Sequence, residues 1–267
     1  MRIICLIKYV PDTEQFEYDY ETDKINREKS RMILNPDDRN AVAWALNQKK
    51  QETSIYVEVV SMGPASTAEE LKNLVRLGAD HATLISDRQF AGSDSLATSV
   101  ILSEYLRSKD FDILLTGTHT LDGGTGHVGP QVAECLEIDQ FSNIRSIEAM
   151  TKDHSIVEAV HEEKTLRVKL QNPCVLGLTS QMNLRLGFVR YENIDKNVDT
   201  HFTLVTNETL NLSEEEVGRK GSPTKVRKTR VAKREKQESK VVQVDEQGIE
   251  EVVRFLQEKG YIACSRH

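Results

Sequence analysis

The first two-thirds of the chain alternates short runs of β-branched residues with longer stretches whose apolar residues recur every three or four positions. Short apolar runs separated by amphipathic helical stretches are typical of a parallel sheet that is covered by helices on both faces. We therefore predict an α/β fold. The predicted strands are residues 3–7, 55–61, 82–85 and 113–115.

Local start and stop signals predict three helices between these strands. Asn35 can cap a first helix that has Pro36 at its first position. The Ser-Thr pair at residues 66–67 stands three positions before two glutamates, which predicts the start of a second helix, and Gly78 ends it. A third helix is predicted over about residues 94–107.

Later in the chain the pattern changes to alternation. Ile156 marks one extended run, Val168 and Leu170 mark the next, and residues 162–164 form a polar turn between them. Alternating runs joined by a polar turn indicate a β-hairpin, which we expect to return to the sheet. A further strand is predicted at residues 174–178.

From about residue 183 the chain loses clean periodicity until an amphipathic helix near residues 247–259. This region has too little apolar surface to fold alone. We interpret residues 1–190 as the α/β domain and residues 191–267 as an extended arm with a terminal helix that wraps a partner.

The formal charge of −7 is unevenly distributed. Residues 219–240 carry ten Lys or Arg against two Glu, a local charge of +8, which leaves −15 for the rest of the chain. Such a basic segment can bind nucleic acid or an acidic protein partner. Because aromatic residues and a nucleic-acid-binding motif are both absent from it, we expect a strap on an acidic partner and no nucleic acid.

Cysteine and histidine are too dispersed to predict a metal site. Cys5, Cys135, Cys174 and Cys264 show no C-x-x-C spacing for zinc or an iron-sulfur cluster. No stretch of about 18 apolar residues occurs, so we expect a cytoplasmic protein without membrane insertion.

Residues 111–136, FDILLTGTHTLDGGTGHVGPQVAECL, carry the candidate chemistry. They read as a strand, a glycine-rich turn and a helix that Gly129 and Pro130 open. Backbone N–H groups in such a turn and at a helix N-terminus bind phosphate, and Thr125 offers a hydroxyl. The segment is neither a Walker loop nor a Rossmann fingerprint. The alternative is a tight turn that only connects strand to helix.

Five blocks occur in the same order as in electron transfer flavoprotein beta subunits, which the chain resembles over most of residues 1–190. They are IKYVPDT, LNPDDRNAVAWAL, VVSMGPASTAEELKNLVRLGADHATLISD, TGTHTLDGGTGHVGPQVAECL and TLRVKLQNPCVLGL. The resemblance implies a doubly wound parallel sheet of the adenine nucleotide alpha hydrolase-like type. It also implies a hairpin and a C-terminal arm that embraces the alpha subunit of an obligate heterodimer.

Members of this family bind either a structural AMP or an FAD that performs electron bifurcation. The AMP-type turn is commonly D-D-D-x-N-Q-T-G, whereas the bifurcating type resembles D-G-x-T-x-x-V-G-P. Residues 122–130, DGGTGHVGP, fit the second pattern, although Gly124 and the Gly126-His127 pair depart from its usual residues. The resemblance therefore implies FAD. A carrier with AMP and a non-redox adenine-nucleotide-binding protein are the alternatives.

The same resemblance implies the residues of the pocket. Asn35 and Asp38 are expected at the adenine or ribose end and residues 125–128 at the phosphates, where His127 would either stay neutral or carry a charge. Two of these residues also have a purely structural explanation. Asn35 can cap its helix, and Met62 can fill the core. The expected cofactor-binding residues are Leu6, Lys8, Asn35, Pro36, Asp37, Asp38, Met62, Thr116, Gly117, Thr118, Thr120, Asp122, Gly123, Gly124, Thr125, Gly126, His127 and Val128.

Bifurcating relatives imply that NADH reduces the FAD of this chain. One electron would pass to ferredoxin or flavodoxin, and the other through an alpha-subunit FAD to a flavin-dependent dehydrogenase of the acyl-CoA, enoyl-CoA or lactate type. No catalytic side chain is expected in this chain. Residues 182–191, MNLRLGFVRY, stand where the family has an N-E-P-R-Y type docking segment and depart from that pattern.

Overall fold

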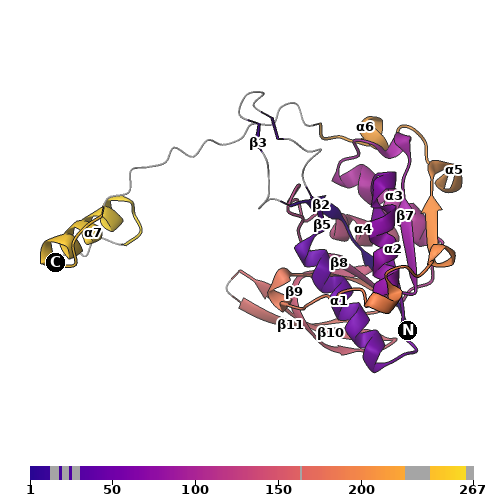
Figure 1. The fold of residues 1–267 in the computed structure, drawn as a ribbon, viewed down its shortest axis with the longest axis horizontal. Helices are drawn as coiled ribbons and strands as arrows, with labels where there is room; N and C mark the ends of the chain where they lie inside the picture. Colours follow the sequence, from indigo (N-terminus) through magenta and orange to yellow (C-terminus); the bar gives the residue numbers. More distant parts are fainter. Residues whose placement is uncertain (13–17, 20–23, 26–30, 163, 226–240, 263–267) are drawn as a thin grey trace. The chain divides into compact units, whose positions relative to one another are not determined.

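A nine-stranded sheet is the core of residues 1–225 in the computed structural model, which describes residues 1–12, 18–19, 24–25, 31–162, 164–225 and 241–262 (Figure 1). The strand order is β11-β10-β9-β12-β8-β1-β6-β7-β13, and neighbours from β9 to β13 run parallel. The strands are β1 (Arg2–Leu6), β6 (Tyr56–Met62), β7 (His81–Ile85), β8 (Ile113–Gly117), β9 (Asp139–Met150), β10 (His154–His161), β11 (Lys164–Gln171), β12 (Cys174–Leu178) and β13 (Phe202–Val205).

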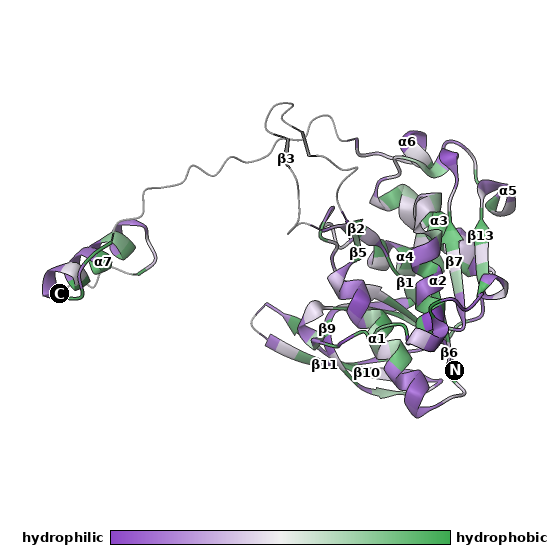
Figure 2. Cartoon of the chain, in the orientation of Figure 1, coloured by the Kyte–Doolittle hydropathy of each residue, from purple (hydrophilic) through white to green (hydrophobic). Residues whose placement is uncertain are grey.

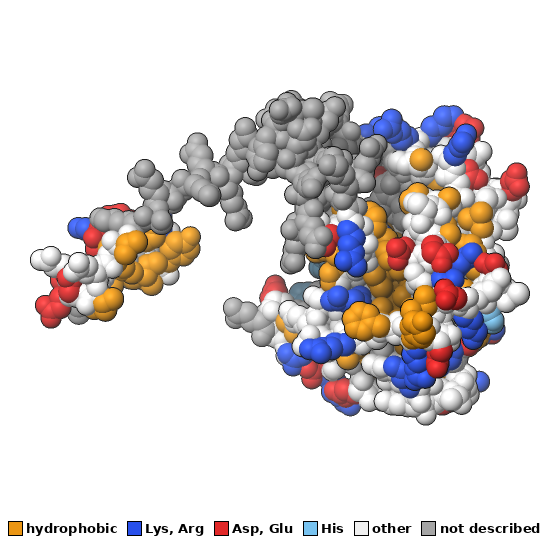
Figure 3. All heavy atoms as spheres, viewed as in Figure 1, with side chains coloured by type: hydrophobic (Ala, Val, Ile, Leu, Met, Phe, Trp, Pro, Cys, Tyr) orange, Lys and Arg blue, Asp and Glu red, His pale blue; other side chains and the backbone are white. Residues whose placement is uncertain are grey.

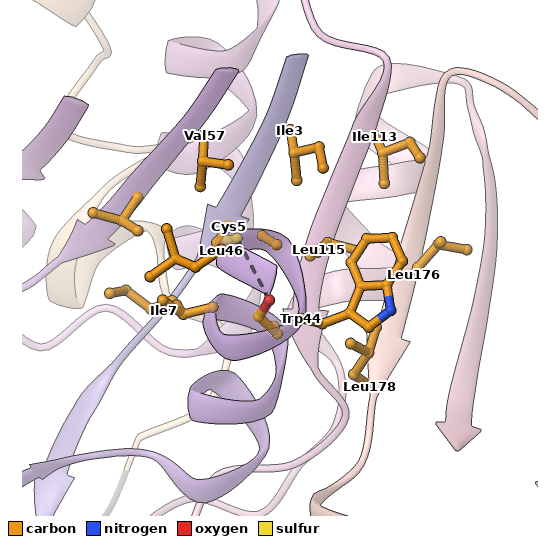
Figure 4. Packing of buried hydrophobic residues seen from close by; sticks show 14 of the residues in the cluster. Ile3, Cys5, Ile7, Trp44, Leu46, Val57, Ile113, Leu115, Leu176 and Leu178 are labelled. Atoms are coloured by element: carbon orange, nitrogen blue, oxygen red, sulfur yellow. Dashed lines mark hydrogen bonds between the residues drawn. The ribbon is translucent and has the colours of Figure 1, made fainter. Parts of the chain in front are cut away.

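Helices cover both faces of this sheet. On one face, α1 (Pro36–Gln51) and α2 (Ala68–Leu77) enclose the larger apolar cluster. In Figure 4, Trp44 and Leu46 from α1 lie among side chains of β1, β8 and β12. On the other face, α3 (Ser95–Arg107) and α4 (Val128–Leu136) enclose the second cluster. Figure 2 shows the central strands as predominantly hydrophobic. The predicted doubly wound parallel sheet is confirmed.

Local signals account for most of the element boundaries. Helix α1 begins at Pro36, although Asn35 makes no capping bond to it. Helix α2 follows the 3-10 turn η1 (Ala65–Thr67), also without a side-chain cap, and ends at Gly78, whose φ is 134°. Asp94 caps α3 by accepting from two backbone N–H groups. The predicted hairpin is present as antiparallel β10 and β11.

Shorter elements complete the described chain. β2 (Tyr9–Pro11) pairs with β5 (Met32–Leu34), and β3 (Tyr18–Asp19) pairs with β4 (Lys24–Ile25). The remaining elements are η2 (Arg88–Phe90), η3 (Ser180–Met182), η4 (Tyr191–Asn193), η5 (Asp199–His201), α5 (Asn207–Leu210), α6 (Gly218–Gly221) and α7 (Glu246–Glu258).

The chain consists of two compact units, residues 1–225 and residues 226–267. The first unit continues beyond residue 190 because β13 adds to the sheet beside β7, a strand that the sequence pattern did not predict. Its last segment is fixed to the start of α3, since Asp94 Oδ2 accepts from Thr224 N at 2.9 Å and from Thr224 Oγ1 at 2.6 Å.

The second unit contains α7, whose N-terminus is capped by Asp245. The apolar side chains of this helix lie exposed along it, as the orange atoms in Figure 3 show; they include Ile249, Val252, Val253 and Phe255. Most of the predicted basic strap, residues 226–240, lies outside the described residues, as do residues 263–267. None of the described helices is long and apolar enough to cross a membrane.

Candidate functional site

The candidate site lies at the carboxyl ends of β1 and β8. The chain adds β6 on one side of β1 and β8 on the other, which makes this pair the switch point where open α/β sheets bind ligands. Asp38, in the first turn of α1, joins the two strand ends. Its Oδ2 accepts from Lys8 N and its Oδ1 accepts from Gly117 N, each at 2.8 Å.

Asp38 is only 4% exposed. Burial raises the pKa of its carboxyl to about 7, because the charged form is poorly solvated there. The hydrogen bonds from Lys8 N, Gly117 N and the Asn35 side chain favour the ionised form and oppose this shift, while the charge of Asp37 adds to it. The carboxyl that joins β1 to β8 therefore titrates near neutral pH.

Two further side chains at the start of α1 hold the loop that follows β8. Asn35 Nδ2 donates to His119 O at 2.8 Å, and Asn35 Oδ1 accepts from Leu121 N at 3.2 Å. Asp37 Oδ2 accepts from His119 N at 3.0 Å, and its Oδ1 accepts from Ser180 N, after β12, at 2.7 Å. All six polar side-chain atoms of Asn35, Asp37 and Asp38 therefore bond to backbone.

The glycine turn itself is largely exposed and is shaped by local bonds. Gly124 and Gly126 have φ values of 61° and 65°, in the left-handed region that glycine adopts without strain. Asp122 Oδ1 accepts from Gly123 N at 2.7 Å. A Cβ on residue 126 would come within 3.2 Å of His119 Nε2, so the backbone here passes close to the preceding loop.

The turn presents backbone donors that the protein does not use. Among the described residues, no hydrogen bond is donated by the N–H groups of Thr125, Gly126, Val128 or Gly129. The last two belong to the first turn of α4, where the helix dipole adds positive potential. A phosphate or diphosphate provides the acceptors that these groups lack. The geometry therefore fits an anionic ligand with several phosphate oxygens.

Lys8 and Asp122 connect the end of β1 to this turn. Lys8 Nζ lies 2.5 Å from Asp122 Oδ2, and the two side chains are 46% and 36% exposed. Partial burial disfavours the ionised form of Asp122, but the hydrogen bond and charge of Lys8, with donors from Thr120 and Gly123, outweigh it and lower the pKa.

The remaining predicted residues occupy two kinds of place. Leu6 is buried in the α3–α4 core, and Met62 packs against the same cluster. Thr118 Oγ1 donates to Gly177 O at 3.0 Å and accepts from Asn143 N, which ties the loop to β12 and β9. Pro36 begins α1, Thr116 is buried in β8, and Thr120 Oγ1 accepts from Gly124 N at 3.4 Å.

Ser180 also bonds to one of the side chains at the start of α1, but no feature of the sequence predicted this contact. Its contribution is a backbone N–H, and Asp37, its partner, is 143 positions earlier in the chain.

A separate cavity of about 240 Å³ lies between the ends of α1 and α2 and the loop that precedes η4. Four cationic side chains line it, with apolar surface from Leu46 and Leu77; the cations are Lys50, Arg76, Arg185 and Arg190. Phe188 and Tyr191 beside it are 95% and 92% exposed. The cavity therefore adjoins residues 182–191, which stand at the place of the family's docking segment, and not the glycine turn.

Several known proteins are similar in sequence to this chain. A family model described as electron transfer flavoprotein domain matches residues 22–193. The chain is 36% identical over 230 residues to the electron transfer flavoprotein subunit beta of Thermoanaerobacterium thermosaccharolyticum, covering 85% of this chain and 86% of that protein. It is 31% identical over 262 residues to the protein of the same name from Clostridium acetobutylicum, covering 98% and 100%. The caffeyl-CoA reductase-Etf complex subunit CarD of Acetobacterium woodii is 35% identical over 230 residues, covering 85% and 86%.

Proposed function

This chain belongs to the family of electron transfer flavoprotein beta subunits, and from that premise we propose that its glycine turn binds the diphosphate of an FAD. The observation that carries the proposal is the set of unused N–H groups at Thr125, Gly126, Val128 and Gly129, which lie in the glycine turn and the first turn of α4. Backbone donors at a helix N-terminus are suited to phosphate oxygens.

The proposal for FAD rather than AMP rests on the turn sequence. Asp122, Gly123 and Thr125 fit the pattern of bifurcating relatives, and Val128-Gly129-Pro130 completes it. The AMP-type pattern has acidic residues where this chain has glycines. Glycines leave space beside the turn, and their backbone can approach a bulky diphosphate closely.

The protein contributes binding and position. A bound FAD supplies the redox chemistry. The α4 N-terminus offsets phosphate charge, Lys8 adds a cation beside the turn, and the α1 side chains hold the preceding loop. No acid, base or nucleophile is assigned to this chain, so it acts as one subunit of an oxidoreductase complex and not as an enzyme by itself.

We propose a complex that connects three kinds of electron carrier. They are NAD(H), ferredoxin or flavodoxin, and a flavin-dependent dehydrogenase, with electron bifurcation as the overall process. The relative from Acetobacterium woodii is named as a subunit of a caffeyl-CoA reductase complex, which supports an acyl-CoA or enoyl-CoA type of dehydrogenase partner over a lactate type.

Two regions are proposed to contact protein partners. The arm, with the basic segment and α7, is proposed to wrap the alpha subunit, because the exposed apolar side chains of α7 need a partner surface. Residues 182–191 are proposed to dock the dehydrogenase. Phe188 and Tyr191 are almost fully exposed there, and exposed aromatic residues next to arginine are enriched at protein interfaces.

The nucleotide content of the purified alpha–beta complex tests the proposal. The complex is denatured, and its released nucleotides are separated and quantified. Two FAD per heterodimer are expected. One FAD with one AMP would replace the proposal with the non-bifurcating carrier, and ATP without flavin would indicate an adenine-nucleotide-binding protein with no redox role.

A further inference from the structure

We infer that the cavity between α1, α2 and the loop before η4 receives an acidic side chain of the dehydrogenase that docks on residues 182–191. We call it the cationic cavity, and its four cations are Lys50, Arg76, Arg185 and Arg190. The inference rests on the proposed function. It adds the chemistry that the dehydrogenase presents to this chain and the place where that chemistry binds.

Two of the four cations already have a carboxylate within the chain. Arg76 Nη1 lies 2.6 Å from Glu69 Oε1 and also donates to Asn73 Oδ1 at 2.7 Å. Arg190 Nη1 lies 3.5 Å from Glu192 Oε1, and both of these side chains are at least 70% exposed. An ion pair so long and so well solvated is weak, which leaves the Arg190 guanidinium able to bind another carboxylate.

Lys50 and Arg185 have no carboxylate partner. Among the residues that the structure describes, neither of them forms an ion pair, and no acidic residue lines the cavity. Lys50 Nζ reaches only the neutral amide oxygen Oδ1 of Asn47, at 3.5 Å. Like charges around one cavity repel one another, and the apolar walls of Leu46 and Leu77 reduce screening by water. An anion in the cavity would therefore be stabilised.

The helix ends account for only part of this arrangement. Lys50 and Arg76 lie in the last turns of α1 and α2, where a cation stabilises the helix dipole. The two arginines of the loop do not belong to the end of an α-helix. Their loop is attached to α1, since Asn40 Oδ1 accepts from Leu184 N at 2.8 Å. Two further cations are thus held beside two helix ends that already have their own.

The size and the rim of the cationic cavity favour a protein side chain over a small molecule. Its volume of about 240 Å³ is below the range of about 300–1,000 Å³ that is usual for ligand pockets. One Asp or Glu with an apolar neighbour suits it, because the walls combine cations with Leu46 and Leu77. Phe188 and Tyr191 beside it are 95% and 92% exposed, and aromatic residues with arginine dominate the binding energy of many protein interfaces.

Lys50→Gln and Arg185→Gln in the full alpha–beta complex test the charge. The probe is an acyl-CoA dehydrogenase of the same organism, used as electron donor to the complex. We expect its KM for the complex to rise at least ~10-fold in each variant, because each change removes a charged hydrogen-bond donor. The kcat and the reduction of the complex by NADH should not change. Arg185→Lys should retain most of the affinity, and Lys152→Gln, at an exposed lysine of the hairpin, is the control.

Carbodiimide cross-linking of the complex with this dehydrogenase identifies the occupant, because the reagent joins a lysine amine to a carboxylate in contact with it. Mass spectrometry should find Lys50 joined to an Asp or Glu of the dehydrogenase, and Lys152 joined to none. An unchanged KM in both glutamine variants, an equal rise in Lys152→Gln, or a missing Lys50 cross-link would overturn the inference. Inorganic phosphate that binds wild type but not Arg185→Gln, with KM unchanged, would assign the cavity to a small anion instead. Wild type without flavin would overturn the proposed function, whereas the cross-link needs no flavin and decides the occupant separately.

Discussion

Lys8 Nζ and Asp122 Oδ2 lie 2.5 Å apart and join the end of β1 to the glycine turn across 114 positions of sequence. Both side chains are more than a third exposed, and exposed ion pairs stabilise a fold by about 0–1 kcal/mol. Asp122→Ala should therefore leave the unfolding midpoint nearly unchanged. It should lower the nucleotide retained on purification by several-fold, because Asp122 also orders Gly123 N.

The matched control for this change is Glu214→Ala, which removes the exposed Lys220–Glu214 pair elsewhere on the first unit. Full nucleotide occupancy in the Asp122 variant, measured by absorbance after denaturation, would contradict a site at this turn. Equal losses in both variants would point to a general effect of surface charge.

Gly117 and Gly123 should respond differently to a methyl group. A Cβ at residue 117 would overlap Asp38 Oδ1 and lie 2.9 Å from Asp38 N, so Gly117→Ala must displace the start of α1. We expect a loss of about 2–4 kcal/mol in unfolding free energy, typical of overpacking in a site that also breaks buried hydrogen bonds. At residue 123 the nearest atom is Thr120 Oγ1 at 3.7 Å, and Gly123→Ala should change stability by less than about 0.5 kcal/mol. Chemical denaturation of the two variants measures the difference.

Removal of residues 226–267 should weaken association with the alpha subunit while the rest of the chain stays folded. Thr224 is bonded to Asp94, so the first unit is complete before the cut. Co-purification with a tagged alpha subunit measures the effect, and a shorter deletion of residues 241–267 separates the contribution of α7 from that of the basic segment. Full co-purification of the chain that lacks residues 226–267 would show that these residues do not hold the alpha subunit.

Local sequence signals predicted the elements that are specified by neighbouring residues. Pro36 sets the start of α1, Gly78 ends α2, and the glycines between residues 122 and 129 mark the turn. Each of these features depends on the allowed backbone angles of one or two residues. They are therefore readable without knowing the fold.

Features that depend on distant parts of the chain were not predictable in this way. β13 is four residues long with two exposed positions, so its sequence carries little strand signal until β7 is beside it. Asn35 looked like a cap, and its real partners are residues 119 and 121. Such pairings are set by the packing of the sheet, which the local pattern does not contain.

Asp38 should make stability depend on pH in the opposite sense to an ordinary salt-bridged aspartate. Its folded pKa of about 7 is above the usual aspartate pKa of 3.8, so the folded state holds this proton over the range in which the unfolded chain has lost it. Its contribution to stability is full below about pH 4 and is lost as pH rises through 7, by up to about 1.4 kcal/mol per pH unit. Wild type minus Asp38→Asn, compared by urea denaturation from pH 5 to 8.5, isolates this effect from carboxyls with lowered pKa such as Asp122. A flat difference would contradict it.

Tyr105 OH and Thr83 Oγ1 both donate to Oε1 of Glu58, at 2.7 and 2.8 Å, inside the face of the sheet that α3 covers. Glu58 is 3% exposed, and among the described residues no cation forms an ion pair with it, so these two hydroxyls carry its solvation. Burial and the neighbouring carboxylate also raise the pKa of Tyr105, which keeps its hydroxyl protonated as a donor.

Tyr105→Phe should therefore cost about 1–3 kcal/mol of unfolding free energy, the penalty for leaving a buried acceptor short of a partner. Tyr191→Phe, where the side chain is 92% exposed, is the control and should change stability by less than about 0.5 kcal/mol. Nucleotide content should be unchanged in both variants, because the Tyr105 hydroxyl bonds to Glu58 on β6, lies 2.9 Å from Thr83 Oγ1 on β7, and does not bond to the glycine turn. Loss of nucleotide from a Tyr105→Phe protein that unfolds at the wild-type urea concentration would show that the network acts on the site rather than on the core.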